Sequence, residues 1–213
     1  MSKTPAQRAA KHGDRAVPGK AVPPANPTVQ RSPQQARSNA NLIIIAGVVT
    51  VLFLFWYYHL LTLNQMTQLS GGLAMPDSLI GGYDLAYLES LRSAMDADAL
   101  GQLSYLHKTA GLLFPLIFGF TWLLLIGQNT QRRTLRWVLW SAPLLFVIVD
   151  LWENVAIDAA LGAAELTAGD AALAGGLTLA RWILLGLSLL AAVAAVFSRR
   201  VGRPPELLAQ QEG

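Results

Sequence analysis

Four long apolar runs dominate the chain and leave little choice of fold. They cover residues 42–63, 104–127, 135–158 and 173–198. A helix rises about 1.5 Å per residue, so about 20 apolar residues cross a hydrocarbon layer of about 30 Å. Each run exceeds that length, and only 14% of the chain is charged, which is too little for an ordinary soluble domain. We predict an all-α fold with a four-helix transmembrane bundle over residues 42–198.

Residues 1–41 differ sharply from the rest of the chain. They carry seven Lys or Arg residues against Asp14 alone, and they are poor in large apolar side chains. We therefore predict a disordered basic tail on the cytoplasmic side, in contact with anionic membrane lipid. We expect no binding to nucleic acid, because the tail has no aromatic side chain for stacking and no folded motif.

Charge alternates along the segments that join the apolar runs. Residues 1–41, 128–134 and 199–213 are basic, whereas the connections 64–103 and 159–172 are mostly acidic. Lys and Arg stay on the cytoplasmic side of membranes. We therefore expect a multi-pass protein of the cell membrane with both termini cytoplasmic, residues 199–213 forming a short C-terminal tail.

The long connection 64–103 contains a second helical pattern. Leu85, Leu88, Leu91 and Met95 recur at helical spacing, with polar residues on the opposite side, and Asp84 precedes them as an N-cap. This predicts a short amphipathic helix at about residues 84–96. It would lie on the outer membrane surface or cap the bundle.

The third apolar run holds three polar residues that lipid would not tolerate. Asp150, Glu153 and Asn154 are three and four residues apart, so they share one helix face. A carboxylate at the centre of a membrane helix costs roughly 2.5–3.5 kcal/mol on insertion scales. We expect this face to point toward other helices or a polar cavity.

Arg181 of the fourth run lies at the depth of those carboxyls. Each site is eight residues from the outer end of its run, or about 12 Å of helix. Helices joined by a short connection are usually neighbours, so Arg181 should pair with Asp150 or Glu153. Histidines and a lysine of the first two runs approach the same level. The predicted outer polar cluster consists of His59, His107, Lys108, Asp150, Glu153, Asn154 and Arg181.

This cluster permits several functions. It is either an ion-pair network that fixes helix register or a polar pocket in which one carboxyl stays protonated. Our first hypothesis is a non-enzymatic pocket that binds a lipid headgroup or small ligand, or assembles with a partner. The alternative is an integral-membrane enzyme acting on a lipid or isoprenoid, with Asp150 or Glu153 as acid/base catalyst and Arg181 holding an anionic group. A proton-coupled small transporter is the third hypothesis.

Cofactor motifs are weak in this chain. His59 and His107 could hold a b-type haem axially, which stays open as an alternative. No metal site is predicted, because the chain has no cysteine and Lys108 and Arg181 lie beside the acids. A homo-oligomer is possible, since Gly175-Gly176 and the alanines of the fourth run permit close helix contact.

Five short motifs carry a resemblance to a known group of proteins. They are Met75-Pro76-Asp77, Gly82-Tyr83, Gly101 with Tyr105, Phe114-Pro115, and Asp150-Leu-Trp-Glu-Asn154. With them, roughly residues 75–185 resemble a family of uncharacterised bacterial four-span integral membrane proteins that share the Asp-x-x-Glu-Asn element in the third span. The resemblance implies a four-span fold in the bacterial inner membrane and marks Asp150, Glu153 and Asn154. It implies no activity.

Overall fold

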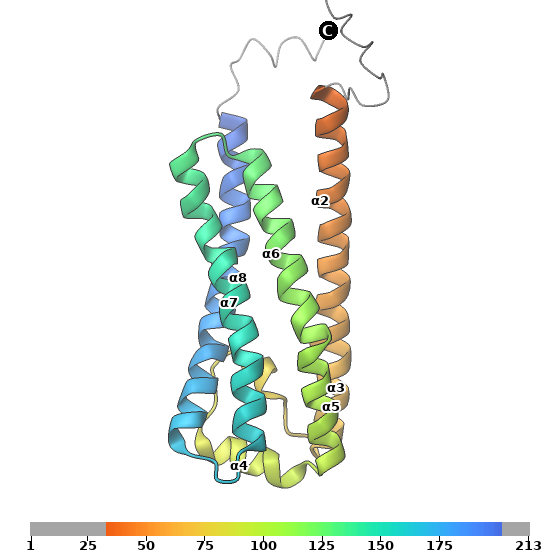
Figure 1. Cartoon of the computed structure of the whole chain (residues 1–213), viewed down its shortest axis with the longest axis vertical. Helices are drawn as coiled ribbons and strands as arrows, with labels where there is room; N and C mark the ends of the chain where they lie inside the picture. Colours follow the sequence, from red (N-terminus) through yellow and green to blue (C-terminus); the bar gives the residue numbers. More distant parts are fainter. Residues whose placement is uncertain (1–32, 202–213) are drawn as a thin grey trace, which may run out of the picture. The chain divides into compact units, whose positions relative to one another are not determined.

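The computed structural model describes residues 33–201, and every element there is helical, as predicted. The elements, shown in Figure 1, are α2 Pro33–Phe55, the π-helix η1 Trp56–Thr62, α3 Leu63–Leu69, the 3-10 turn η2 Pro76–Ser78, α4 Leu85–Ala94, α5 Ala97–Lys108, α6 Ala110–Asn129, α7 Arg133–Gly162 and α8 Ala168–Val201. The chain divides into two compact units, Met1–Leu42 and Ile43–Gly213, and the helical bundle belongs to the second. The disordered tail was predicted over residues 1–41, but residues 33–41 form the start of α2, so that part of the prediction is wrong. Residues 1–32 of the predicted tail, and residues 202–213 of the predicted C-terminal tail, lie outside the described residues.

Within residues 33–201, three helical stretches are long and apolar enough to cross a membrane. They are Ser38–Leu69, Ala97–Asn129 and Ala168–Arg199. They contain the first, second and fourth apolar runs of the sequence. The third run forms α7, which has 30 residues but also five ionisable ones.

The helices extend further than the apolar runs. The first begins at Pro33 rather than near residue 42, because Gln, Ala and Arg before the apolar run also favour helix and Pro suits a first turn. The second begins at Ala97 rather than at residue 104, since the Asp96 carboxylate accepts a hydrogen bond from Ala99 N at 2.8 Å and caps α5.

The predicted short helix of the long connection is confirmed as α4. Asp84 is its N-cap and accepts a hydrogen bond from Tyr87 N at 2.9 Å. Leu88 and Leu91 are fully buried, and α4 contacts α8. Figure 1 shows α4 crossing the end of the bundle where α7 joins α8, so it caps the bundle.

The connection between α3 and α4 folds back onto α8 through two glycines. Gly82 has a φ of +76°, which favours glycine. A Cβ on Gly175 of α8 would lie 2.8 Å from the carbonyl oxygen of Tyr83. The loop backbone therefore lies directly against α8, and this contact places η2 within the bundle. The predicted close approach at Gly175 is thus one between a loop and a helix of the same chain.

Replacing Gly175 with Ala tests this packing. The new methyl group must push the Tyr83 backbone away, and we expect it to lower the free energy of unfolding by about 1–3 kcal/mol. Gly176→Ala is the matched control, because a Cβ there meets nothing within 4 Å. The control should be neutral or stabilising by up to about 1 kcal/mol. Unfolding in mixed micelles measures both, and equal effects of the two substitutions would contradict the loop placement.

Candidate functional site

Arg181 of α8 lies at the centre of a buried polar network. Its side chain is 2% exposed, with Nη1 at 3.4 Å from Asp150 Oδ1 and Nε at 2.7 Å from Glu153 Oε2. The Nε–H does not point at the Glu153 oxygen, so this contact is an ion pair without an aligned hydrogen bond. The predicted pairing of Arg181 with the acids of the third run is therefore confirmed, and both acids take part.

Asp77 is a central residue of this network that the predicted cluster did not include, and Tyr58, Ser104 and Asp158 were likewise not predicted. Asp77 comes from η2, is fully buried, and its backbone oxygen accepts hydrogen bonds from Arg181 Nη2 and, at 3.2 Å, from Trp182 Nε1. Its carboxylate accepts from Tyr58 Oη at 2.9 Å and lies 3.3 Å from His107 Nε2. One residue of the loop thus contacts the first, second and last long helices at once.

The charge state of Asp77 follows from these neighbours. Burial by itself raises the pKa of a carboxyl. The facing His107 ring, the Arg181 guanidinium and the Tyr58 hydroxyl outweigh that effect and hold the pKa of Asp77 well below its ordinary value. Asp77 is therefore a fixed negative charge at neutral pH.

His107 bridges two carboxyl groups. Its Nδ1 lies 2.5 Å from Asp158 Oδ1, while Nε2 faces Asp77. The ring can donate to both only as the doubly protonated imidazolium. Both of its nitrogens contact carboxyl oxygens, and the haem alternative through His59 and His107 stays a prediction.

The network reaches the surface at its Asp158 end. The Asp158 side chain is 21% exposed and accepts a hydrogen bond from Ser104 Oγ at 2.8 Å. Lys108 in turn donates to Ser104 Oγ at 2.8 Å and is exposed. Lys108 therefore joins the network at its exposed edge, through Ser104, and does not lie among the buried groups. It follows His107 by one residue, which turns it about 100° around the helix and away from the bundle.

His59 lies beside the network within an aromatic enclosure. Its ring centroid lies 4.8 Å from that of Phe55, 5.3 Å from Phe114 and 5.8 Å from Trp182, and its Nδ1 is buried without a partner. The Arg181 guanidinium lies over the same Trp182 ring at 4.9 Å. His59 belongs to η1, a π-helical turn of a kind frequent at functional sites.

Asn154 satisfies a carbonyl that proline leaves free. Pro115 has no N–H, so the carbonyl of Gly111, four residues earlier, lacks its helical donor. Asn154 Nδ2 donates to that oxygen at 3.1 Å. A Cβ on Gly111 would lie 3.0 Å from Asn154 Nδ2 and 3.2 Å from Tyr58 Oη, so the glycine permits both approaches.

Several acceptors of the network have no hydrogen-bond partner. They are buried and come from the polar face of α7, the atoms being Asp150 Oδ2, Glu153 Oε1, Glu153 Oε2 and Asn154 Oδ1. His59 Nδ1 is also buried without a partner, and the tautomer of the ring decides whether it donates or accepts. The site therefore has unused capacity to accept hydrogen bonds. The guanidinium of Arg181, in contrast, is surrounded by groups of its own chain.

Comparison with known proteins adds no identification. No protein-family model, curated protein or solved structure matches the chain. The resemblance carried by the Asp-x-x-Glu-Asn element therefore stays a prediction. Within residues 33–201, no three His, Asp or Glu side chains converge as a metal would require.

A double-mutant cycle tests the link between Asn154 and Pro115. Asn154→Ala leaves the Gly111 carbonyl buried and unpaired, which should destabilise the protein by about 1–3 kcal/mol. In a Pro115→Ala background the new backbone N–H of residue 115 can donate to the Gly111 carbonyl. The same Asn154 substitution should therefore destabilise that protein by about 1 kcal/mol less. Unfolding free energies of the four proteins give the coupling. Strict additivity would show that the proline does not create the need for Asn154.

Proposed function

We propose that the protein is a four-span protein of the bacterial inner membrane, with α7 as the third span. The acidic face of α7 is buried, Asp150 and Glu153 being 1% and 0% exposed. Apolar residues of its opposite face, Trp152 and Val155, are 54% and 66% exposed, as suits contact with lipid. Helices α6 and α8 pack against it. The alternation of basic and acidic connections supports cytoplasmic termini.

The function that the geometry supports best is binding of a proton in the buried network. Three carboxyls, those of Asp77, Asp150 and Glu153, are 0–1% exposed and face two cations, Arg181 and the His107 imidazolium. Full ionisation would leave at least one buried negative charge uncompensated, because His107 also faces the partly exposed Asp158, and such a charge is costly in a low-dielectric interior. Asp77 is ionised, so Asp150 and Glu153 share the proton. This excess of acid over base is the observation that carries the proposal.

The enclosure of the network also favours a proton as the occupant. The side chains around Arg181 exclude solvent, whereas Asp158 at the edge is partly exposed. The contacts from Asp158 through His107 lead inward as far as Asp77, whose backbone oxygen contacts Arg181 beside the acid pair. Such a proton-loaded acid pair suits a proton-coupled transporter.

A small ligand that donates hydrogen bonds is the second candidate. The unpartnered acceptors of Asp150, Glu153 and Asn154 would suit an ammonium group. An anionic headgroup is less suited, because the Arg181 guanidinium is already occupied by Asp150, Glu153 and the Asp77 carbonyl. For the same reason an enzyme that uses Arg181 to hold an anionic substrate is not favoured.

Infrared difference spectroscopy tests the shared proton. Raising the pH of the reconstituted protein should remove a carbonyl stretching band of a protonated carboxyl that is present at neutral pH. Asp150→Asn and Glu153→Gln should each abolish or shift that band, and Glu89→Gln on the exposed face of α4 should leave it unchanged. No such band at neutral pH would mean that both acids are ionised and would defeat the proposal. Loss of the band on adding methylammonium, but not tetramethylammonium, would favour the ligand.

A further inference from the structure

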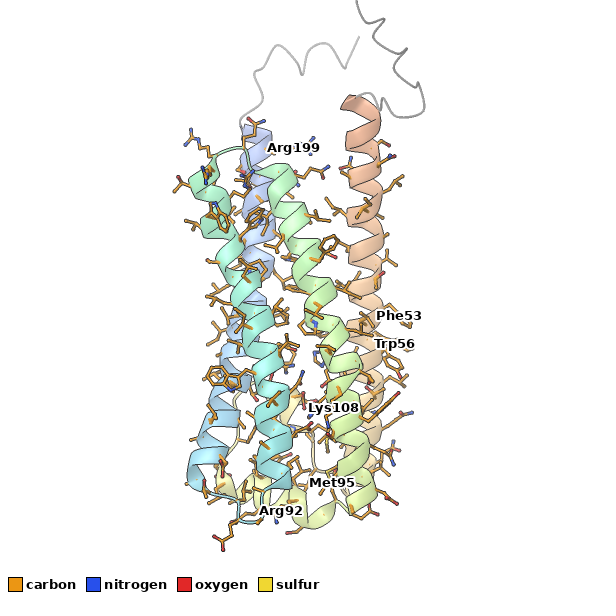
Figure 2. The ribbon with its side chains drawn as sticks, in the orientation of Figure 1. Phe53, Trp56, Arg92, Met95, Lys108 and Arg199 are labelled. Carbon is orange, nitrogen blue, oxygen red and sulfur yellow. The ribbon has the colours of Figure 1, made fainter. Side chains whose placement is uncertain are left out.

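A second polar site lies at the opposite end of the bundle, where α6 turns into α7. Arg132, Arg133 and Arg136 come from the start of α7, and Arg199 comes from the last turns of α8. Arg199 Nη1 donates to Asn129 Oδ1 of α6 at 3.2 Å, which ties the end of α8 to this turn. Figure 2 shows Arg199 at the end of the bundle away from Arg92 and Met95. We call these four residues the arginine cluster.

Arg132, Arg133 and Arg136 occupy an unfavourable place for cations, whereas Arg199 lies in the last turn of α8, where a cation is favoured. The N-terminus of a helix carries partial positive charge, and a cation there is destabilising by about 0.3–1 kcal/mol. The first turn of α7 has no acidic residue, and its N-cap, Arg132, makes no side-chain capping bond. Among the described side chains, no carboxylate lies within 4.0 Å of any member of the cluster. An anion from outside the described residues would resolve this charge excess.

Two buried hydrogen-bond donors near the turn also lack an acceptor, which a bound anion would supply. The side chain of Thr130 is 2% exposed and its hydroxyl has no partner. The Nε of Arg136 is also buried without a partner. Buried polar groups without hydrogen bonds are rare, because each costs about 1–3 kcal/mol. Thr130 ends α6 just before the α7 N-cap, so both donors belong to the turn that carries the arginines.

The Arg136 side chain is held in place by a fixed aromatic ring. Its guanidinium lies 5.3 Å from the centroid of the Trp140 ring. Trp140 Nε1 donates to Leu123 O at 3.0 Å, and the ring packs against Gly127, where a Cβ would lie 3.2 Å away. A stacked guanidinium loses less freedom on binding and presents its edge to an oxyanion. The site is therefore built into the fold and differs from a set of loose surface arginines.

We infer that the arginine cluster binds a phosphate group. Guanidinium forks, a helix N-terminus and a hydroxyl are the donors that tetrahedral phosphate oxygens accept. The phosphate could be that of an anionic phospholipid or free inorganic phosphate. Exposed Trp137 beside the cluster suits a lipid-facing site. This site shares no residue with the acidic network, so it stands independently of the proposed proton binding.

Native mass spectrometry of the full chain at fixed salt tests the inference. The probes are phosphatidylglycerol, phosphatidylcholine and inorganic phosphate. We expect the wild type to retain phosphatidylglycerol over phosphatidylcholine and Arg136→Gln to weaken that binding about tenfold, the loss of one charge-assisted contact. Arg92→Gln, the same change at the other end of the bundle, is the matched control. Displacement of bound lipid by inorganic phosphate would make the free anion the ligand.

Two further variants distinguish a specific phosphate site from non-specific attraction between positive charge and anionic lipid. Arg136→Lys keeps the charge but loses the planar fork, so it should also weaken binding. Thr130→Val keeps the shape but loses the buried donor, and a smaller weakening is expected. Thermal unfolding of each variant checks that the fold is retained. Equal binding by Arg136→Gln and Arg92→Gln, or wild-type binding by Arg136→Lys, would overturn the inference.

Discussion

The contact of one guanidinium with two carboxyls holds the centre of this molecule together. Arg181 is fully buried, and a buried ion without a partner is destabilising by several kcal/mol. Its partners come from α7 and from the loop between α3 and α4, so these parts must lie where the charge requires them. The same constraint explains why the most polar stretch of α7 faces α8 while its apolar residues face outward.

The loop that carries Asp77 encloses the polar site between α7 and α8. Gly82 and Gly175 let the loop backbone lie against α8, and α4 then covers that end of the bundle. Asp77 links the Arg181 centre to His107 and so to the partly exposed Asp158. The polar groups thus form one chain of contacts rather than separate ion pairs. A membrane protein gains from this arrangement because each polar group inside it needs a partner.

The spacing of residues in the sequence was sufficient to predict those features of the structure that depend on a single helix or on two consecutive helices. The spacing of Asp150 and Glu153 and their depth relative to Arg181 follow from helix geometry, and the cap by Asp84 follows from local chemistry. Asp77 could not be placed in this way, because its burial depends on a loop folding against a distant helix. Its neighbours Met75 and Pro76 were a signal, since a buried loop needs apolar residues beside its acid. Lys108 lies at the exposed edge of the network, a detail that depth alone could not give because depth does not fix the direction around the helix.

The most direct measurement is the free energy of unfolding of Arg181→Gln alone and combined with Glu153→Gln or Asp150→Asn. If the acids of α7 and Arg181 share a site sheltered from lipid, Arg181→Gln should destabilise the protein by about 3–5 kcal/mol, because it leaves buried acids uncompensated. Removing one acid as well should then restore part of that stability. Additive losses in the double variants would contradict the account, since they would mean that Arg181 and the acids do not meet.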